Sequence, residues 1–242
     1  MALVSYIKRK ANLIFLSLFG WIAVRFATRK FRKANLLISD LRGAMKLCFE
    51  FKYHGISINP AQIPEEIQKF LEIAQKIEPK TIVEIGTAKG GTLYLLSKIA
   101  DKKAKIISID LPGGLFGGGY EHRKIPLLRS FSQYSQEIVL LRADSHEEET
   151  VRKLKDILGG GEIDLLFIDG DHRYEGVRKD FEMYSPLVRK GGIIAFHDIC
   201  PGPPEDVGGV PLFWKETMRK YRNMPIIKDQ SQSGYGIGVL LL

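Results

Sequence analysis

The chain has 242 residues, of which 45% are hydrophobic, so it is long and apolar enough to bury a full core. This excludes an intrinsically disordered chain and suits one large α/β domain with an appendage. The two cysteines, Cys48 and Cys200, lie far apart and provide neither a disulfide framework nor a metal-knuckle spacing.

The formal net charge of +8 is concentrated near the N-terminus. Residues 1–53 contain 11 of the 36 Lys and Arg residues and 2 of the 28 Asp and Glu residues, a net charge of +9. The remainder has 25 basic and 26 acidic residues, a net charge of −1. Because this body is nearly neutral, we expect no nucleic-acid groove across it.

The basic N-terminal segment contains an apolar stretch, ANLIFLSLFGWIAV, over residues 11–24. A membrane-spanning helix needs about 20 apolar residues, so this stretch is short for one. No small-x-small cleavage site follows it, which disfavours a secretory signal. Three interpretations stay open: a helix on an anionic membrane surface with Phe19 and Trp21 in the interface, a helix buried at a homodimer contact, and a spanning anchor.

The short length of this apolar stretch favours the two interpretations in which the helix does not span a membrane. We therefore expect a cytoplasmic protein whose residues 8–33 either make peripheral contact with the inner face of the membrane or pair in a homodimer. The segment 1–58 is expected to be helical, and the main domain is expected to occupy residues 59–242.

Helix and strand patterns alternate along the main domain. Apolar residues at helical spacing predict a helix over 63–77, with Pro64 in its first turn. The other predicted elements, in chain order, are strand 81–85, helix 92–100, strand 105–109, helix 126–134, strand 138–141, strand 165–168, helix 174–187, strand 193–196, helix 212–222, strand 225–227 and strand 236–241. This alternation predicts a doubly wound, mostly parallel sheet of seven strands covered by helices.

The loop after the first of these strands is rich in glycine and reads EIGTAKGGT over residues 84–92. Glycine lets a ligand approach the backbone closely. A dinucleotide fingerprint requires glycine where Ala88 stands, and no Gly-Lys-Ser/Thr follows at phosphate-loop spacing. Glu84 would repel a pyrophosphate but suits a ligand with an amino group. The loop therefore disfavours a nicotinamide-dependent dehydrogenase.

Two apolar runs end in ionisable side chains, and these runs are 165–168 and 193–196. The first stops at Asp169-Gly-Asp171-His172, and the second stops at His197-Asp198. Ligands bind outside the carboxyl ends of parallel strands, so these side chains are expected to share a crevice, although any single acid is also a common helix cap. Adjacent strand residues point to opposite faces, so both residues of the second pair enter the crevice only if the strand bends.

A long glycine-rich loop over residues 111–124 is expected to act as a lid. Leu115, Phe116 and Tyr120 would close over a ligand, while the basic residues of 122–124 would recognise an anionic group. A solvated flexible loop is the alternative. A second, proline-rich loop over 201–211 is expected to shape a substrate pocket beside Asp198.

These motifs resemble those of the class I S-adenosylmethionine-dependent methyltransferases over roughly residues 81–242. EIGTAKGG resembles the family's E/DxGxGxG cofactor loop, Asp110 resembles the acid that binds the ribose hydroxyls, and Asp144 resembles the residue near the adenine. The final GIGVLLL resembles the family's antiparallel last strand, which implies a Rossmann-like methyltransferase fold. The cofactor-binding residues that the resemblance implies are Glu84, Gly86, Thr87, Ala88, Gly90, Gly91, Thr92, Asp110, Asp144, Ser145 and Asp169.

The pair FIDGDHRYEGV and GGIIAFHD looks closest to small-molecule O-methyltransferases of the cephalosporin-biosynthesis and caffeoyl-CoA types. In their metal-dependent members, an acid and an adjacent Asp-Asn pair hold a divalent cation; by position these are Asp169, His197 and Asp198, with His197 in place of an acid. The set suits Mg²⁺, Mn²⁺ or a softer ion such as Fe²⁺ or Zn²⁺. Metal-free base catalysis by His172 or His197 is the alternative.

The resemblance implies methyl transfer from S-adenosylmethionine to a hydroxyl of a small polar or sugar-like molecule. The catalytic residues that it implies are Asp169, Asp171, His172 and His197. Two other functions stay open: an NAD-dependent oxidoreductase, and a non-catalytic, membrane-recruited module built on a methyltransferase fold.

Overall fold

The structure is a computed structural model. It describes the backbone of residues 2–113 and 119–242, and the side chains of residues 19–113 and 119–242. Leu115 and Phe116, which were expected to close over a ligand, lie outside the described residues.

A seven-stranded sheet lies at the centre of the described chain, with the strand order β5-β4-β3-β6-β7-β9-β8. Its strands are β3 (Thr81–Ile85), β4 (Lys105–Asp110), β5 (Glu137–Arg142), β6 (Ile163–Ile168), β7 (Val188–His197), β8 (Arg222–Ile226) and β9 (Ile237–Leu241). The strands from β5 to β7 are parallel, whereas β9 is antiparallel to both β7 and β8. The predicted doubly wound, mostly parallel sheet with an antiparallel last strand is confirmed.

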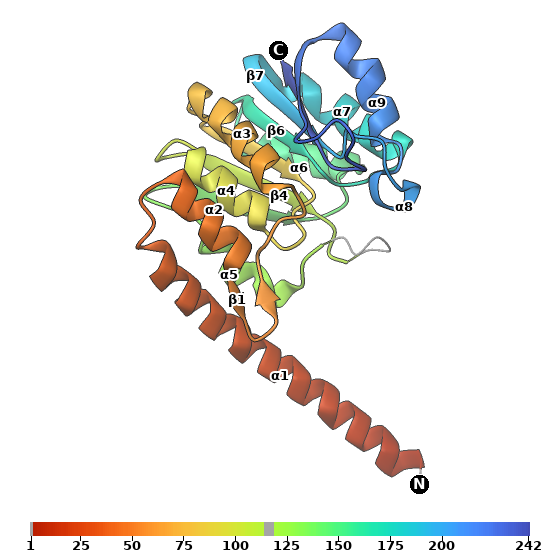
Figure 1. Cartoon of the computed structure of the whole chain (residues 1–242). Helices are drawn as coiled ribbons and strands as arrows, with labels where there is room; N and C mark the ends of the chain where they lie inside the picture. Colours follow the sequence, from red (N-terminus) through yellow and green to blue (C-terminus); the bar gives the residue numbers. More distant parts are fainter. Residues whose placement is uncertain (1, 114–118) are drawn as a thin grey trace.

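Helices cover both faces of this sheet (Figure 1). One face packs against α3 (Pro64–Ala74), α4 (Gly91–Ile99) and α5 (Ile125–Arg129). The other face packs against α6 (Glu148–Leu158), α7 (Tyr174–Tyr184) and α9 (Val210–Thr217), and a short helix, α8 (Pro204–Val207), precedes α9. The central strands are continuous apolar runs because both of their faces are buried. This arrangement leaves the carboxyl ends of the parallel strands free to form a site.

The N-terminal segment contains α1 (Ala2–Asn35), α2 (Leu41–Glu50) and a hairpin of β1 (Lys52–Tyr53) with β2 (Ile56–Ser57). Asp40 caps α2 by accepting a hydrogen bond of 2.7 Å from the Gly43 N–H. The last part of α1 packs on the body, while its N-terminal half projects beyond it (Figure 1). In the part of the chain that the structure describes, no helix is both long and apolar enough to cross a membrane.

Phe31 packs the end of α1 against the body. Its ring is fully buried, with centroids 5.3 Å from Phe51, 5.1 Å from Tyr94 and 5.0 Å from Phe131. The end of α1 therefore shares a hydrophobic core with the helices that cover the sheet. The division of the chain at residue 58 stays a prediction.

Replacing Phe31 by Ala is expected to lower the free energy of unfolding by about 3–5 kcal/mol, because it leaves a cavity among three aromatic rings. Urea denaturation of the full chain measures this loss. Phe26, also on α1, is 48% exposed, so Phe26→Ala is the matched control and should change stability by less than about 0.5 kcal/mol. Equal losses in both variants would contradict this packing.

Candidate active site

Two cavities open at the carboxyl edge of the sheet. The first cavity, of about 530 Å³, lies over the ends of β3, β4 and β6 and reaches the loop after β5. The second cavity, of about 770 Å³, lies over the ends of β6 and β7 and the loop around α8. They share one wall, formed by Pro60, Ala61, Asp169, Gly170, Asp171, His172 and Arg173.

The glycine-rich loop forms one side of the first cavity. Gly86 has φ +86°, and a Cβ atom there would lie 2.0 Å from the carbonyl oxygen of Asp169. Only glycine can therefore hold this loop against β6. Ala88 has φ +47°, in the left-handed region that glycine favours, so it keeps the turn although it carries a side chain. Thr87, Gly91 and Thr92 also line this cavity.

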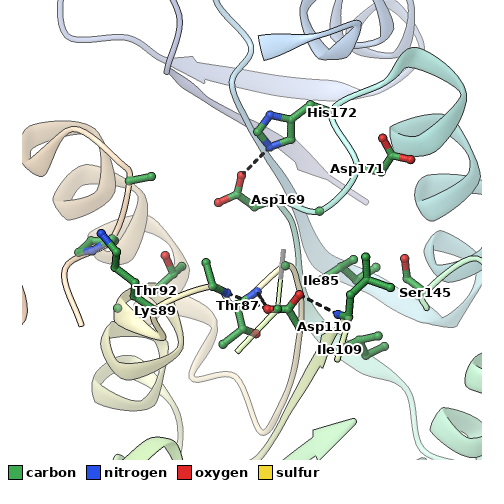
Figure 2. Close-up of a pocket in the computed structure, with 18 of the residues that line it drawn as sticks. Ile85, Thr87, Lys89, Thr92, Ile109, Asp110, Ser145, Asp169, Asp171 and His172 are labelled. Atoms are coloured by element: carbon green, nitrogen blue, oxygen red, sulfur yellow. Dashed lines mark hydrogen bonds and ion pairs between the residues drawn. The ribbon is translucent and has the colours of Figure 1, made fainter. Parts of the chain in front are cut away.

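Asp110, at the end of β4, is fixed by the same loop. Its Oδ2 atom accepts hydrogen bonds from the Thr87 N–H (2.9 Å) and the Ala88 N–H (2.8 Å), and its Oδ1 atom accepts one from the Leu111 N–H (2.8 Å) (Figure 2). Burial raises the pKa of Asp110, although these N–H groups oppose the shift. The carboxylate therefore lies in a fixed position on the wall of the first cavity.

Glu84 and Gly90 lie behind the loop and do not line the first cavity. Glu84 is fully buried, and its Oε2 atom accepts a hydrogen bond of 2.6 Å from the Thr87 hydroxyl. Burial raises the pKa of Glu84 well above its ordinary value. A Cβ atom on Gly90 would lie 2.3 Å from Leu128 of α5. Both residues therefore support the loop, and their contact with a cofactor stays a prediction.

The loop after β5 forms the far side of the first cavity with Asp144, Ser145 and His146. Asp144 accepts a hydrogen bond of 2.8 Å from the His146 N–H. The His146 Nε2 atom lies 3.3 Å from the carboxylate of Asp180, which is fully buried in α7. This contact with Asp180 raises the pKa of His146 against the opposing effect of burial. Asp180 was not predicted from the sequence as part of the site.

Four ionisable side chains converge where the second cavity meets the shared wall. The His197 Nδ1 atom lies 3.1 Å from Asp169 Oδ1 and 3.2 Å from Asp198 Oδ2. His172 lies 3.6 Å from Asp169 through Nε2 and 3.5 Å from Asp198 through Nδ1. Asp198 has φ +60°, so the chain turns sharply at the end of β7. This turn is the bend that both His197 and Asp198 need to reach Asp169.

The charges of this cluster depend on one another. Contact with Asp169 raises the pKa of His172 to about 9, although burial opposes it. Burial alone would lower the pKa of His197, but Asp169 and Asp198 outweigh burial and raise it to about 10. Burial likewise opposes ionisation of Asp169, yet the two histidines hold its pKa below the ordinary value. Two carboxylates in this pocket thus attract positive charge.

The geometry adds His172 to the residues that could hold a metal ion. Asp169, His172 and Asp198 each offer a ligand atom, and these atoms lie within 4.8 Å of one another. The expected set contained His197 in place of His172. His197 contacts both acids through Nδ1, and its Nε2 atom is buried with no hydrogen-bond partner among the described residues.

Asp171, expected to be catalytic, is held by Arg173 at the shared wall. Its Oδ1 atom accepts hydrogen bonds from the Arg173 N–H (2.9 Å) and from Arg173 Nε (3.0 Å). Burial opposes ionisation of Asp171, but Arg173 lowers its pKa below the ordinary value. In Figure 2, His172 and Asp169 point toward each other, whereas Asp171 lies apart from them. Its carboxylate is therefore engaged outside the cluster.

Gln62, which was not predicted from the sequence, links the two sides of the site. Its Nε2 atom donates a hydrogen bond of 2.7 Å to Asp169 Oδ2, and its Oε1 atom accepts one of 2.9 Å from the Thr92 hydroxyl. It is 5% exposed and lies in the loop before α3. Gln62 therefore fixes the orientation of Asp169 from the opposite side to the histidines.

Comparison with known proteins agrees with this architecture. Residues 83–199 match the family model described as a methyltransferase domain. The fold is similar to that of the O-methyltransferase from Bacillus cereus in complex with SAH, with a TM-score of 0.56, 16% identity and coverage of 86% of this chain and 93% of that one. It is also similar to TomG, an O-methyltransferase from Streptomyces achromogenes involved in tomaymycin synthesis and solved with SAM, with a TM-score of 0.56, 16% identity and coverage of 91% and 95%.

Two curated relatives are uncharacterized proteins. One, from Acanthamoeba polyphaga mimivirus, is 39% identical over 119 residues, which are 49% of this chain and 51% of the relative. The other, from Sinorhizobium fredii, is 26% identical over 163 residues, which are 63% of this chain and 17% of the relative. The chain thus spans about half the length of the first relative and less than a fifth of the second. Residues 83–199 therefore match a methyltransferase domain, and the fold is similar to that of solved O-methyltransferases.

Proposed function

We propose that this protein transfers a methyl group from S-adenosylmethionine to a hydroxyl group of a small polar or sugar-like molecule. The observation that carries the proposal is the shared wall of the two cavities. Methyl transfer requires a donor and an acceptor to meet in line, because proximity and orientation supply much of the rate. Donor and acceptor in adjoining cavities would meet beside Asp169.

The first cavity suits the methyl donor. Its volume of about 530 Å³ lies in the usual range for small-molecule sites. Asp110, held by backbone N–H groups on the cavity wall, would accept hydrogen bonds from the ribose hydroxyls. Asp144 and Ser145 on the far side would contact the adenine, and the loop at Gly86 leaves room for the rest of the cofactor.

The second cavity suits a polar acceptor because its wall carries acids, imidazoles and a phenol. These residues are Asp169, Asp198, Glu205, Asp206, His172, His197 and Tyr235. Pro203 and Pro204 of the second loop also line it, as expected from their place beside Asp198. Such a wall offers hydrogen bonds to several hydroxyl groups of one acceptor.

The acceptor hydroxyl must lose its proton. The cluster fits a divalent cation, because two carboxylates and an imidazole converge and the histidines beside them have raised pKa values. Asp169, His172 and Asp198 would hold such an ion, and when bound it would lower the pKa of the hydroxyl. Without a cation, His172 would accept the proton directly, but with a pKa of about 9 it is protonated at neutral pH.

The pH profile separates these two routes. In chelator-treated enzyme, kcat/KM is expected to rise about tenfold per pH unit from pH 7 toward the pKa of His172 at about 9, because only the neutral imidazole accepts a proton. Added Mg²⁺ or Mn²⁺ is expected to raise the rate at pH 7 and flatten the profile, since a coordinated His172 carries no titrating proton. Initial rates across this range measure both effects. If the profiles are flat and equally high with and without chelator, neither a cation nor His172 takes part in removing the proton.

Replacing Gln62 by Leu is expected to lower kcat/KM about tenfold, because Asp169 loses the hydrogen bond that orients it. Binding of S-adenosylhomocysteine should change by less than about threefold, since the remaining wall of the first cavity is intact. Steady-state kinetics and calorimetry measure the two effects. Gln68→Leu is the matched control, because the Gln68 amide donates a hydrogen bond to Glu72 on the exposed surface of α3, away from Asp169. If both variants behave alike, the hydrogen bond to Asp169 has no role in the reaction.

A screen of polyhydroxylated acceptors with S-adenosylmethionine tests the proposed reaction, with mass spectrometry locating the added methyl group on oxygen. Methylation on nitrogen or carbon would overturn the hydroxyl assignment. An NAD-dependent oxidoreductase would instead reduce NAD when NAD replaces S-adenosylmethionine in the screen. Ala88 and the antiparallel pair β8–β9 disfavour that function.

A further inference from the structure

One face of α1 points away from the domain and carries apolar side chains. Val24, Ala27 and Phe31 share the buried face of this helix. Ile22 and Phe26, four residues apart, lie on another face and are 52% and 48% exposed. This part of α1 meets the body on another side, where the Trp21 ring lies 5.9 Å from His122, while Ile22 and Phe26 remain at the surface. An apolar helix face in this position is normally covered by a partner.

Positive charge continues along the same exposed face. Arg29 and Lys33 follow Phe26 by three and seven residues, which keeps them on its side of the helix, and both are exposed. The segment 1–53 has a net charge of +9, whereas the rest of the chain has −1. The body therefore provides no excess of negative charge to balance this segment. A partner that covers the apolar face should itself be anionic.

The partner that these features fit is a lipid surface. We propose that α1 lies in the headgroup region of an anionic bilayer, with Ile22 and Phe26 in the lipid and Arg29 and Lys33 at the phosphates. The apolar residues 11–24 would form about 21 Å of helix at 1.5 Å per residue, less than the hydrocarbon core of about 30 Å. Cations precede and follow this stretch in the sequence. An in-plane helix lets both sets reach the headgroups of one leaflet.

Charge also separates the bilayer from a second copy of the chain. A dimer through this face would bring two segments of +9 together and place their Arg29 and Lys33 side chains close to one another. Like charges in an interface oppose association, whereas anionic lipids attract them. Trp21, 43% exposed beside this face, is a residue type that prefers the membrane interface.

Vesicle binding by the full chain tests the proposal. Vesicles of phosphatidylcholine mixed with phosphatidylglycerol should bind it at least about tenfold more tightly than phosphatidylcholine alone. The emission of Trp21 should shift to shorter wavelength on binding. The chain has two tryptophans, and Trp214 is 4% exposed, so it supplies a constant background. Failure to bind the mixed vesicles would overturn the proposal.

Two double variants locate the contact. The first double variant, Ile22→Glu with Phe26→Glu, should weaken binding to the mixed vesicles at least about tenfold. The second, Arg29→Glu with Lys33→Glu, should weaken binding by a similar factor while keeping every apolar residue. Leu212→Glu is the matched control, because Leu212 is 55% exposed and belongs to α9, which lies far from α1 in Figure 1. The affinity of this variant for the mixed vesicles should stay unchanged. Unchanged vesicle binding in either double variant would overturn the proposal. The proposal would also be overturned if the chain does not bind vesicles but forms a dimer in analytical ultracentrifugation, and the first double variant dissociates this dimer.

Discussion

Replacing Asp169 or Asp198 by Asn is expected to lower turnover by about 100-fold or more. Each substitution removes a carboxylate that contacts both His172 and His197 and that would help to hold a cation, so the acceptor hydroxyl keeps its proton. Asp198 lines the second cavity but not the first, so Asp198→Asn should leave binding of S-adenosylhomocysteine within about threefold. Turnover and calorimetry on the same preparations measure the difference.

The control for these variants is Asp206→Asn. This acid lines the second cavity too, but His172 contacts its backbone carbonyl and not its carboxylate. Because this acid belongs to the wall proposed to bind the acceptor, removing the same charge there should act mainly on KM and change kcat by less than about threefold. If the Asp169 and Asp198 variants keep full turnover, the cluster is not the reactive site. A non-catalytic module on this fold would tolerate both substitutions.

Replacing Gly86 by Ala is expected to abolish cofactor binding, with an affinity loss of about 100-fold or more. The new Cβ atom would meet the backbone carbonyl of Asp169 at 2.0 Å, and φ is +86°, so the loop must leave its place beside β6. Because Asp169 belongs to the shared wall, this displacement would disturb both cavities. Calorimetric titration with S-adenosylhomocysteine measures the loss.

Gly160→Ala is the control that separates the effect of the clash at Gly86 from the effect of its positive φ. Gly160 has φ +85°, nearly that of Gly86, but a Cβ atom there meets nothing within 4 Å. Its substitution should cost only the left-handed strain of about 1–2 kcal/mol in stability and leave cofactor binding unchanged. If Gly86→Ala behaves like Gly160→Ala, the close approach of the loop to β6 does not control the first cavity.

The sheet could be predicted because its parallel strands are buried on both faces and read as short, continuous apolar runs. The helix α6 was not predicted because its sequence EETVRKLKDIL is rich in charge, although Val151, Leu154, Ile157 and Leu158 recur at helical spacing and lie in or against the core. The helices α5 and α9 end earlier than expected, at Arg129 and Thr217, because tertiary contacts and not propensity decide helix ends. The N-terminal segment was expected to be helical, and α1 and α2 are helices, but residues 52–57 form the hairpin β1–β2.

The site was predictable where it depends on strand ends. Asp110, Asp169 and His197 end β4, β6 and β7 or follow them directly, so the parallel sheet alone brings them to one edge. The relative places of His172 and His197 depend on the turn at Asp198, and Asp, although more common at positive φ than most residue types, does not by itself predict such a turn. Local sequence cannot reveal such details.

The contact between Gln62 and Asp169 shows the same limit at longer range. It joins residues 107 positions apart, so no local pattern in a single sequence indicates it. The supporting place of Glu84 likewise depends on how the loop packs over β3, because its carboxylate lies beneath Thr87 and not in the first cavity.

Calorimetric titration of the full chain with S-adenosylhomocysteine tests the central claim most directly, repeated with NAD and with the Asp110→Ala variant. The proposed function predicts micromolar binding of S-adenosylhomocysteine, a loss of at least about tenfold in affinity for the variant, and no binding of NAD. Binding of NAD, or of neither ligand, would contradict the assignment of the first cavity to a methyl donor.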